Sequence, residues 1–325
     1  MPYELTDKLV VGISSRTLFD LEKENQIFEN EHLEAYIRYQ VENEDDLLKP
    51  GTAFPMVKAM LAANTAEKRL FEVIVMFRNS PDTGLRIFNS IGHYGIDITR
   101  AALTGGEPLA PYLAAFNVDL FLSKSKSDVQ AAIDAGFAAA LIYDAPEGFE
   151  PDSERIRIAL DADAVLFAEE SEQIYKEKGL DAFFEHERQH ARRLLPEGPF
   201  AKFLKTISTL QRDIEPEKAP IRIAIVTARN SPAHERVIRT LREWGVRVDA
   251  AFFLGGISKD AVLKAFRAHM FFDDQEVHLG LASTLVPAGL VPYRTGSPLK
   301  GTVEAAKGNE EGISTNSTCE PENCA

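Results

Sequence analysis

The chain has 325 residues, 45% of them hydrophobic, which is enough to build cores for about two domains. Acidic residues outnumber Lys and Arg by 50 to 36, so the formal charge is −14, and there is no basic stripe; this argues against a nucleic-acid or anionic-membrane partner. The sequence has no basic leader and no apolar run near the roughly eighteen residues of a membrane helix, so a cytoplasmic protein with a small ligand is expected. Both cysteines stand in the last seven residues and offer the folded part neither a disulfide framework nor a thiolate metal site.

Strand-like apolar runs alternate with helical patterns along the chain. This alternation predicts an α/β fold in which helices cover a parallel sheet. From residue 295 onward almost nothing large and apolar remains, so residues 295–325 are predicted to form a disordered tail. The strand-like runs occupy residues 8–14, 71–77, 139–143, 156–160, 221–227, 250–254, 270–272 and 289–293.

The two halves of the chain resemble each other. The stretch "VMFRNSPDTGLRIFNSIGHYGIDI" from Val75 parallels "VTARNSPAHERVIRTLREWGVRVD" from Val226, each with a strand, then Arg-Asn-Ser-Pro, then an amphipathic helix. Each Ser-Pro pair is predicted to be a helix N-cap followed by the first helical residue. We therefore predict an internal duplication, with one α/β lobe over residues 1–150 and a second over 151–294. The alternative is that two ordinary α/β segments share turn chemistry.

The copies differ in the polar residues at the predicted strand ends. Acids, a Thr and a Lys stand at these positions in the second copy alone. Because both copies keep the apolar pattern that a fold requires, the extra polar residues are predicted to be functional. The alignment sets Asp161 against Ser14, Asp163 against Arg16, Thr227 against Met76, Lys259 against Leu109, and Asp273 and Asp274 against Ser123 and Lys124.

Each of these residues could be accidental alone, but in chain order they describe phosphoryl transfer. A carboxylate at a strand end can attack phosphorus, as Asp161 would. The second acid, Asp163, points the same way along a strand and could protonate the leaving group. Grouped carboxylates repel one another, which implies a hard cation such as Mg²⁺. Thr227 and Lys259 could then hold the phosphoryl oxygens.

The same residues carry a resemblance to a known family. The motifs "DADAV" at Asp161, "VTAR" at Val226, "SK" at Ser258 and "FFDDQ" at Phe272 resemble those of haloacid-dehalogenase (HAD) superfamily phosphohydrolases. The segments "ISSRTLFDLE", "YIRYQ", "PGTAFPMVKAM", "NSIGHY", "LTGG", "FFEHE" and "LREWG" narrow the resemblance to the cytosolic type I 5′-nucleotidases. The likeness extends over nearly all of the chain except the tail.

This resemblance implies a Rossmann-like HAD sheet and Mg²⁺-dependent hydrolysis of nucleoside 5′-monophosphates to nucleoside and phosphate. Ala162 stands where this motif commonly has Gly, a departure that leaves the chemistry intact. Nucleobase preference stays open. The roles implied are Asp161 as nucleophile, Asp163 as acid and base, Thr227 and Lys259 as phosphate contacts, and Asp161, Asp163, Asp273 and Asp274 as metal ligands.

Two segments have roles that the sequence leaves open. Residues 170–218 are a charged helical insert, which in the superfamily acts as a cap over the phosphate site; the alternative is a pair of packing helices. Phe183 in this insert could stack a base or belong to the core. The first lobe is predicted to be catalytically silent, with plain packing, nucleotide binding or a homo-oligomer face as its role. Candidate substrate contacts are Arg229, Arg16, Arg78 and His93.

Other functions remain as alternatives. A phosphatase for sugar phosphates or other small phosphomonoesters would use the same motifs, because they do not encode the leaving group. A nucleotide-binding sensor without turnover is a second alternative, which the full motif set disfavours. A receiver-type signalling domain would place the acid pair first and the Lys last, the reverse of the order found here.

Overall fold

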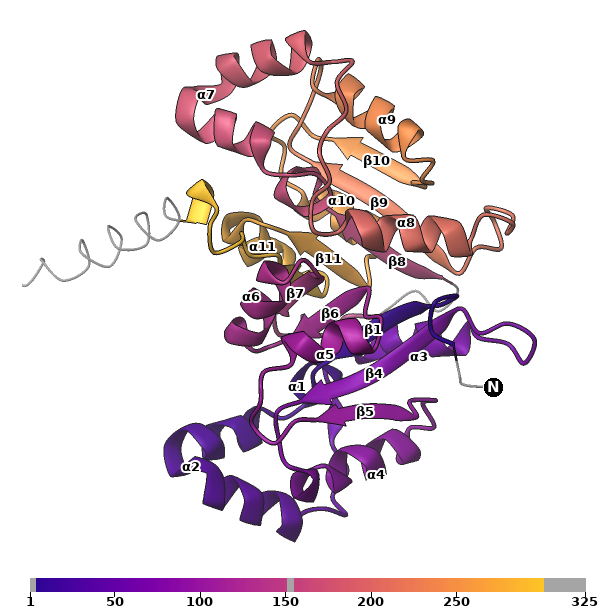
Figure 1. The fold of residues 1–325 in the computed structure, drawn as a ribbon, viewed down its shortest axis with the longest axis vertical. Coiled ribbons are helices and arrows are strands. Elements are labelled where there is room, and N and C mark those ends of the chain that lie inside the picture. Colours follow the sequence, from indigo (N-terminus) through magenta and orange to yellow (C-terminus); the bar gives the residue numbers. More distant parts are fainter. Residues whose placement is uncertain (1–3, 151–154, 301–325) are drawn as a thin grey trace, which may run out of the picture.

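In the computed structural model, which describes residues 4–150 and 155–300, one ten-stranded sheet runs through the whole molecule (Figure 1). The sheet is mostly parallel and is flanked by helices, so the predicted α/β class is confirmed. From edge to edge the strands are β10 (Ala250–Phe253), β9 (Ile221–Thr227), β8 (Ile156–Leu160), β11 (Met270–Asp273), β12 (Ala288–Leu290), β7 (Ala138–Ile142), β6 (Leu120–Ser123), β1 (Leu9–Ile13), β4 (Phe71–Phe77) and β5 (Arg100–Leu103).

The sheet consists of two halves that have the same strand order. Strands β5-β4-β1-β6-β7 correspond to β10-β9-β8-β11-β12, and all neighbours within each half are parallel. The halves meet where β7 and β12 pair antiparallel. Such an arrangement is what an internal duplication predicts, with the two lobes joined in one continuous sheet.

Helices connect the strands, as the crossover connections of a parallel sheet require. Strands β1 and β4 are buried throughout, as expected for parallel strands whose side chains pack beneath helices on both faces of the sheet. The helices are α1 (Ser15–Leu18), α2 (Glu22–Glu42), α3 (Phe54–Ala62), α4 (Leu85–His93), α5 (Ala110–Ala115), α6 (Lys126–Asp134), α7 (Glu170–Gln189), α8 (Ala201–Leu210), α9 (His234–Glu243), α10 (Asp260–Phe266) and α11 (Glu276–Ala282). Short 3₁₀ and π turns span Pro81–Thr83 and Ala162–Leu166, and Phe19–Asp20 pairs with Lys49–Pro50.

The hydrophobic core crosses the expected lobe boundary near residue 150. Helix α8, from the second half, contacts β1 of the first, while α3 of the first half contacts β8 of the second. Phe203 on α8 and Val11 on β1 belong to one buried cluster. The insert predicted at 170–218 therefore divides, since α8 packs into the body of the molecule and α7 lies out toward one end (Figure 1).

The register of the strands is the same in both halves. Ile13 at the end of β1 pairs with Val75 and Leu122, and Leu160 at the end of β8 pairs with Ile225 and Phe272. This register corrects one pairing in the sequence alignment. Thr227, at the end of β9 beside Phe253, corresponds to Phe77 beside Leu103 and not to Met76, because the second half has one more residue between the strand and Arg-Asn-Ser-Pro.

Buried arginines repeat the same contacts in the two halves. Arg86 Nε donates to the carbonyl of Asp46 at 2.8 Å, and Arg236 Nε donates to the carbonyl of Arg193 at 2.8 Å. The long helices α2 and α7 are also broken alike, since His32 (φ 68°) and Gly179 (φ 81°) both leave the helical conformation. These repeated details favour an internal duplication over the alternative that two ordinary α/β segments share only turn chemistry.

The prediction that each Ser-Pro pair is an N-cap and the first helical residue is confirmed in the first half only. Ser80 is the N-cap of the 3₁₀ turn Pro81–Thr83, which Pro81 begins, although its side chain makes no capping hydrogen bond and α4 itself begins at Leu85. In the second half the prediction is wrong, because α9 begins at His234 with Ala233 as its N-cap. The predicted tail also begins too early, because Thr295 donates from its backbone N–H and its hydroxyl to Asp134, and Leu299 is buried. Residues 301–325 lie outside the described part of the chain.

Candidate active site

Five of the predicted residues gather at the carboxyl edge of the second half of the sheet. Asp161 follows β8, Thr227 ends β9, Asp273 ends β11 and Asp274 follows it, while Lys259 stands directly before α10. All five are at least nine-tenths buried. Since β8 lies between β9 and β11, the parallel strands bring their ends to one place.

Three carboxylates form the centre of this site. Asp161, Asp273 and Asp274 each offer an oxygen, and the three oxygens lie within 4.8 Å of one another. Lys259 Nζ lies 2.9 Å from Asp161 and 2.6 Å from Asp273. One ammonium thus contacts two of the three buried carboxyl groups.

The pKa values of this cluster show that burying three carboxyl groups together disfavours their ionised forms. Burial raises the pKa of Asp161 to about 7, against the opposing effect of Lys259. Burial also raises the pKa of Asp274 well above its usual value, with Asp273 adding to the shift. Burial alone would raise the pKa of Asp273 too, but Lys259 and His278 lower it below the usual value. Further positive charge is therefore required to hold all three groups ionised.

The donor set fits a hard divalent cation. Asp274 Oδ1 is buried and has no hydrogen-bond partner, while its other oxygen accepts from the Tyr293 hydroxyl. Asp273 accepts hydrogen bonds from the Gln275 backbone N–H at 2.9 Å and from Lys259 at 2.6 Å, so its orientation is fixed. Oxygen ligands of this kind suit Mg²⁺, which keeps several waters and takes phosphate oxygens in its remaining positions.

Asp163 is placed differently from the prediction. Its carboxylate is not in the three-carboxylate cluster but receives a two-pronged salt bridge from Arg229, with Nε–Oδ2 at 2.7 Å and Nη2–Oδ1 at 2.6 Å. The physical reason is local: β8 ends at Leu160, and Ala164 at φ 57° turns the chain, so strand alternation no longer sets the direction of Asp163.

Arg229, predicted to contact substrate, is held inside the protein. Its side chain is 2% exposed, its Nη1 donates to Glu187 on α7 at 2.6 Å, and its guanidinium lies 5.4 Å from the centroid of the Phe183 ring. Phe183 is buried, which favours the core over an open stacking surface for this ring. Arg229 therefore links Asp163 to the helix that stands over the site.

Sequence reasoning missed several partners of this site. Glu187 holds both Arg229 and Arg236, and Glu172 on α7 accepts from the Gln275 side chain at 3.0 Å. The segment "FFEHE" contains Glu187, but no spacing rule singles out one acid among the fifty in the chain. Tyr293, which donates to Asp274, stands twenty residues beyond β11, and no sequence pattern marked it as a partner of the site either.

The first-half candidates divide into two groups. Arg16 and Arg78 line a pocket at the carboxyl ends of β1 and β4, described below. His93 ends α4, is exposed, and contacts the Tyr94 ring at 5.1 Å between ring centroids. It is not brought together with the two arginines.

Comparisons with known proteins place the chain in a family. The model of the 5′-nucleotidase family matches residues 1–298. Cytosolic 5′-nucleotidase 1B of Homo sapiens is 37% identical over 296 residues, which cover 87% of this chain and 48% of that protein, so the chain spans about half the length of this relative. No solved structure gives a significant match. Within residues 4–150 and 155–300, no helix has the length and apolar character to span a bilayer. By the family match over residues 1–298, the chain belongs to the 5′-nucleotidase family.

Proposed function

We propose that this chain hydrolyses nucleoside 5′-monophosphates to nucleoside and phosphate, with Mg²⁺ as cofactor, in the cytosol. The observation that carries the proposal is the buried cluster of Asp161, Asp273 and Asp274 at the ends of the parallel strands β8 and β11, with Lys259 in contact, in a chain of the 5′-nucleotidase family. A structural ion pair would not need three carboxylates around one ammonium. A phosphoryl-transfer site needs both.

Asp161 is the proposed nucleophile. Its carboxylate oxygen attacks phosphorus, the bond to the 5′-oxygen breaks, and an aspartyl phosphate forms on Asp161. Water then attacks this phosphate, which restores the carboxylate and releases inorganic phosphate. When bound, the cation supplies charge that keeps the carboxylates ionised and neutralises the phosphoryl oxygens. Asp161, Asp273 and Asp274 are its proposed ligands.

Thr227 and Lys259 are the proposed phosphate contacts. Both are buried at the edge of the carboxylate cluster, Thr227 at the end of β9 and Lys259 at the start of α10. Burial by itself would lower the pKa of Lys259, but Asp161 and Asp273 raise it above its ordinary value. The ammonium thus stays charged and can stabilise the phosphoryl oxygens where their negative charge is spread.

Asp163 is the proposed acid and base. It gives a proton to the leaving 5′-oxygen and later takes one from the attacking water. For this, its carboxylate has to leave Arg229 and turn toward Asp161. Because Arg229 is also bound to Glu187 on α7, a movement of α7 as a cap would couple opening and closing of the site to the availability of Asp163.

A substrate panel tests the proposal. Phosphate release is measured for purine and pyrimidine, ribo- and deoxyribonucleoside 5′-monophosphates and for sugar phosphates, each with Mg²⁺ and with EDTA. The proposal predicts release from nucleoside monophosphates that stops in EDTA. Faster release from sugar phosphates would favour the alternative phosphatase, and binding without any release would favour the sensor.

A further inference from the structure

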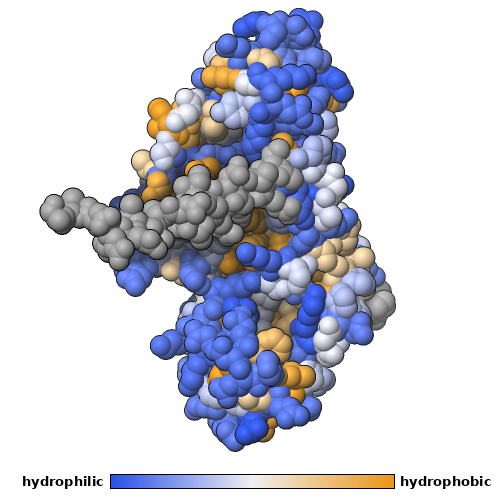
Figure 2. Space-filling model, turned by 90° about the vertical axis from the view of Figure 1, so that its left-hand side faces the viewer, coloured by the Kyte–Doolittle hydropathy of each residue, from blue (hydrophilic) through white to orange (hydrophobic). Residues whose placement is uncertain are grey.

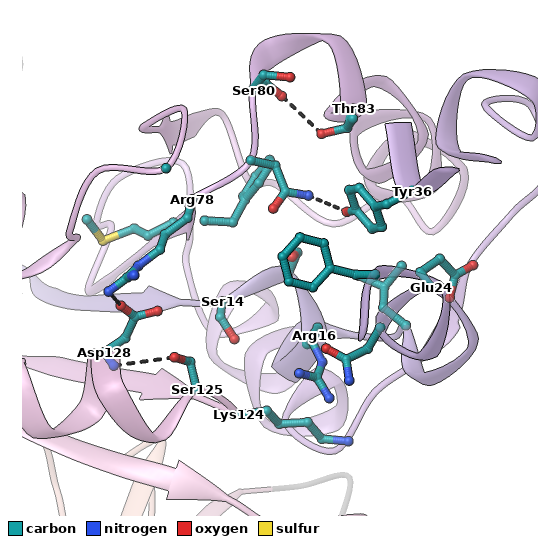
Figure 3. A pocket seen from close by; sticks show the side chains of 18 of the residues that line it. Ser14, Arg16, Glu24, Tyr36, Arg78, Ser80, Thr83, Lys124, Ser125 and Asp128 are labelled. Carbon is teal, nitrogen blue, oxygen red and sulfur yellow. Dashed lines mark hydrogen bonds and ion pairs between the residues drawn. The ribbon is translucent and has the colours of Figure 1, made fainter. Parts of the chain in front are cut away.

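The first half of the chain contains a pocket at the position that corresponds to the active site. It has a volume of about 510 Å³ and lies at the carboxyl ends of β1, β4 and β6, beneath α2 (Figure 3). The backbone N–H of Ser14 donates to the Leu122 carbonyl at 2.9 Å, as that of Asp161 donates to the Phe272 carbonyl at 2.8 Å. Ser14 therefore occupies the place of the proposed nucleophile.

The charges at these corresponding positions are reversed. Where the second half has carboxylates that need a cation, the first half has two serines and two fixed cations, and Leu109 stands in the place of Lys259. A phosphate group would find positive charge here without a metal. At the place of the proposed nucleophile Asp161 it would meet the hydroxyl-bearing Ser14 and not a carboxylate. The replacements are Ser14 for Asp161, Arg16 for Asp163, Ser123 for Asp273 and Lys124 for Asp274.

Two cations of this pocket, Arg16 and Lys124, are paired with acids that are exposed to water, so these ion pairs separate easily. Glu22 holds Arg16 at 3.1 Å and Lys124 at 2.7 Å, and Lys124 also pairs with Asp144. The Glu22 and Asp144 side chains are 42% and 85% exposed, so exchanging them for a ligand anion costs little. Arg16 Nε is buried without a hydrogen-bond partner and is free to donate.

A second arginine adds donor capacity to the pocket. Arg78 forms an ion pair with the buried Asp128, and its Nε is buried without a hydrogen-bond partner. In Figure 3 Arg16 and Lys124 lie together on one side of the pocket, and Arg78 meets Asp128 on another. The buried acid Glu24 is matched by Arg86 at 2.6 Å and so leaves no net negative charge at the wall.

The opposite wall of the pocket is apolar. Helix α2 lines it with Phe28, Leu33, Tyr36 and Ile37, and the Phe28 and Tyr36 rings meet edge-on with centroids 6.0 Å apart. The Leu33 side chain is 56% exposed, although it faces the pocket from a helix. The surface of the lobes is otherwise mostly hydrophilic on the face shown in Figure 2. An apolar wall opposite a cationic one suits a ligand with a flat apolar part and an anionic end.

We propose that this first-half pocket binds a nucleoside monophosphate without a metal and without hydrolysing it. Arg16 and Lys124 would bind the phosphate and the α2 side chains would pack on the base. This second, non-catalytic site is additional to the proposed function. Only the choice of a nucleoside monophosphate as the probe rests on that function.

Equilibrium dialysis of adenosine 5′-monophosphate in EDTA tests the proposal, because without a cation the carboxylates of the second half repel phosphate. We expect one molecule bound per intact wild-type chain, and at least roughly 10-fold weaker binding in the Arg16→Ala/Lys124→Ala double variant. The matched control Lys202→Ala/Arg239→Ala removes two exposed cations outside the pocket and should bind as wild type. Since EDTA stops hydrolysis, this result is independent of the proposed activity.

Two further arms complete the design. Adenosine alone and inorganic phosphate alone should each bind at least roughly 10-fold more weakly than the nucleotide, because each uses one wall. Leu33→Asp changes the apolar wall at an exposed position, so it should fold and bind weakly even if the double variant does not fold. No binding in EDTA, or nucleotide binding that survives both the double variant and Leu33→Asp, would overturn the proposal, as would phosphate binding as tightly as the nucleotide.

Discussion

Replacing Asp161 by Asn should abolish hydrolysis and, in metal-free buffer at alkaline pH, stabilise the chain. An amide has nearly the shape of a carboxylate but cannot attack phosphorus. Burial raises the pKa of Asp161 to about 7 from an ordinary value of 3.8, although Lys259 opposes the shift. Keeping Asp161 ionised in the folded state therefore costs free energy, and Asn removes that cost.

The sign and size of this effect follow from the two pKa values. Because the folded-state pKa lies above the unfolded one, ionisation of Asp161 favours the unfolded chain: the cost is absent below about pH 4, grows up to about pH 7 and is constant above it. About three pKa units at roughly 1.4 kcal/mol each give a ceiling of about 4 kcal/mol. Relaxation of the site and entry of water reduce this figure. We expect Asp161→Asn to raise Tm by at least about 2 °C at pH 8 and not near pH 4.

The assay pairs thermal unfolding in EDTA at both pH values with phosphate release in Mg²⁺. Asp249→Asn is the control: this mostly buried acid directly before β10 accepts a hydrogen bond from the Ile223 backbone N–H at 2.8 Å, so its loss should not raise Tm. A lower Tm for Asp161→Asn at pH 8 would refute the electrostatic reasoning. More than about a hundredth of the wild-type rate would refute its role as nucleophile.

Three further substitutions probe other parts of the site. Lys259→Met should slow phosphate release by roughly 10²-fold or more with the substrate at saturation, because it removes a charge from the transition state; an unchanged kcat would exclude phosphate contact. Asp273→Asn should raise the Mg²⁺ concentration for half-maximal rate by roughly 10-fold or more, and an unchanged Mg²⁺ titration would remove Asp273 from the ligand set. Glu187→Gln should destabilise the chain by about 3–5 kcal/mol in urea unfolding, because two buried arginines lose a charged partner, whereas exposed Glu185→Gln should be neutral; equal effects would contradict this.

Much of the fold could be predicted because its signals are local. Buried parallel strands such as β4 and β9 are continuous apolar runs, and their polar ends mark the edge where ligands bind. The half-buried edge strand β5 and the four-residue β6 were not among the predicted runs, although their equally short counterparts β10 and β11 were. The antiparallel pairing of β7 with β12 could not be predicted from the sequence pattern, because the pairing of two edge strands depends on tertiary packing.

The site could be predicted in part for the same reason. Asp161, Asp273 and Asp274 follow strands directly, so the strand order brings them together. Asp163 was expected beside them by strand alternation, but the backbone turn at Ala164 ends that alternation. Its pairing with Arg229 joins residues far apart in the sequence, and no periodicity reports such a contact.

The most direct test of the central claim is to find the phosphoryl group on the chain during turnover. The wild-type protein is mixed with Mg²⁺ and a nucleoside 5′-monophosphate, quenched in acid, and mapped by peptide mass spectrometry. The account predicts one added phosphoryl group on the peptide that contains Asp161, absent in EDTA and in Asp161→Asn. Phosphate release with no labelled peptide, or with the label on another residue, would contradict it.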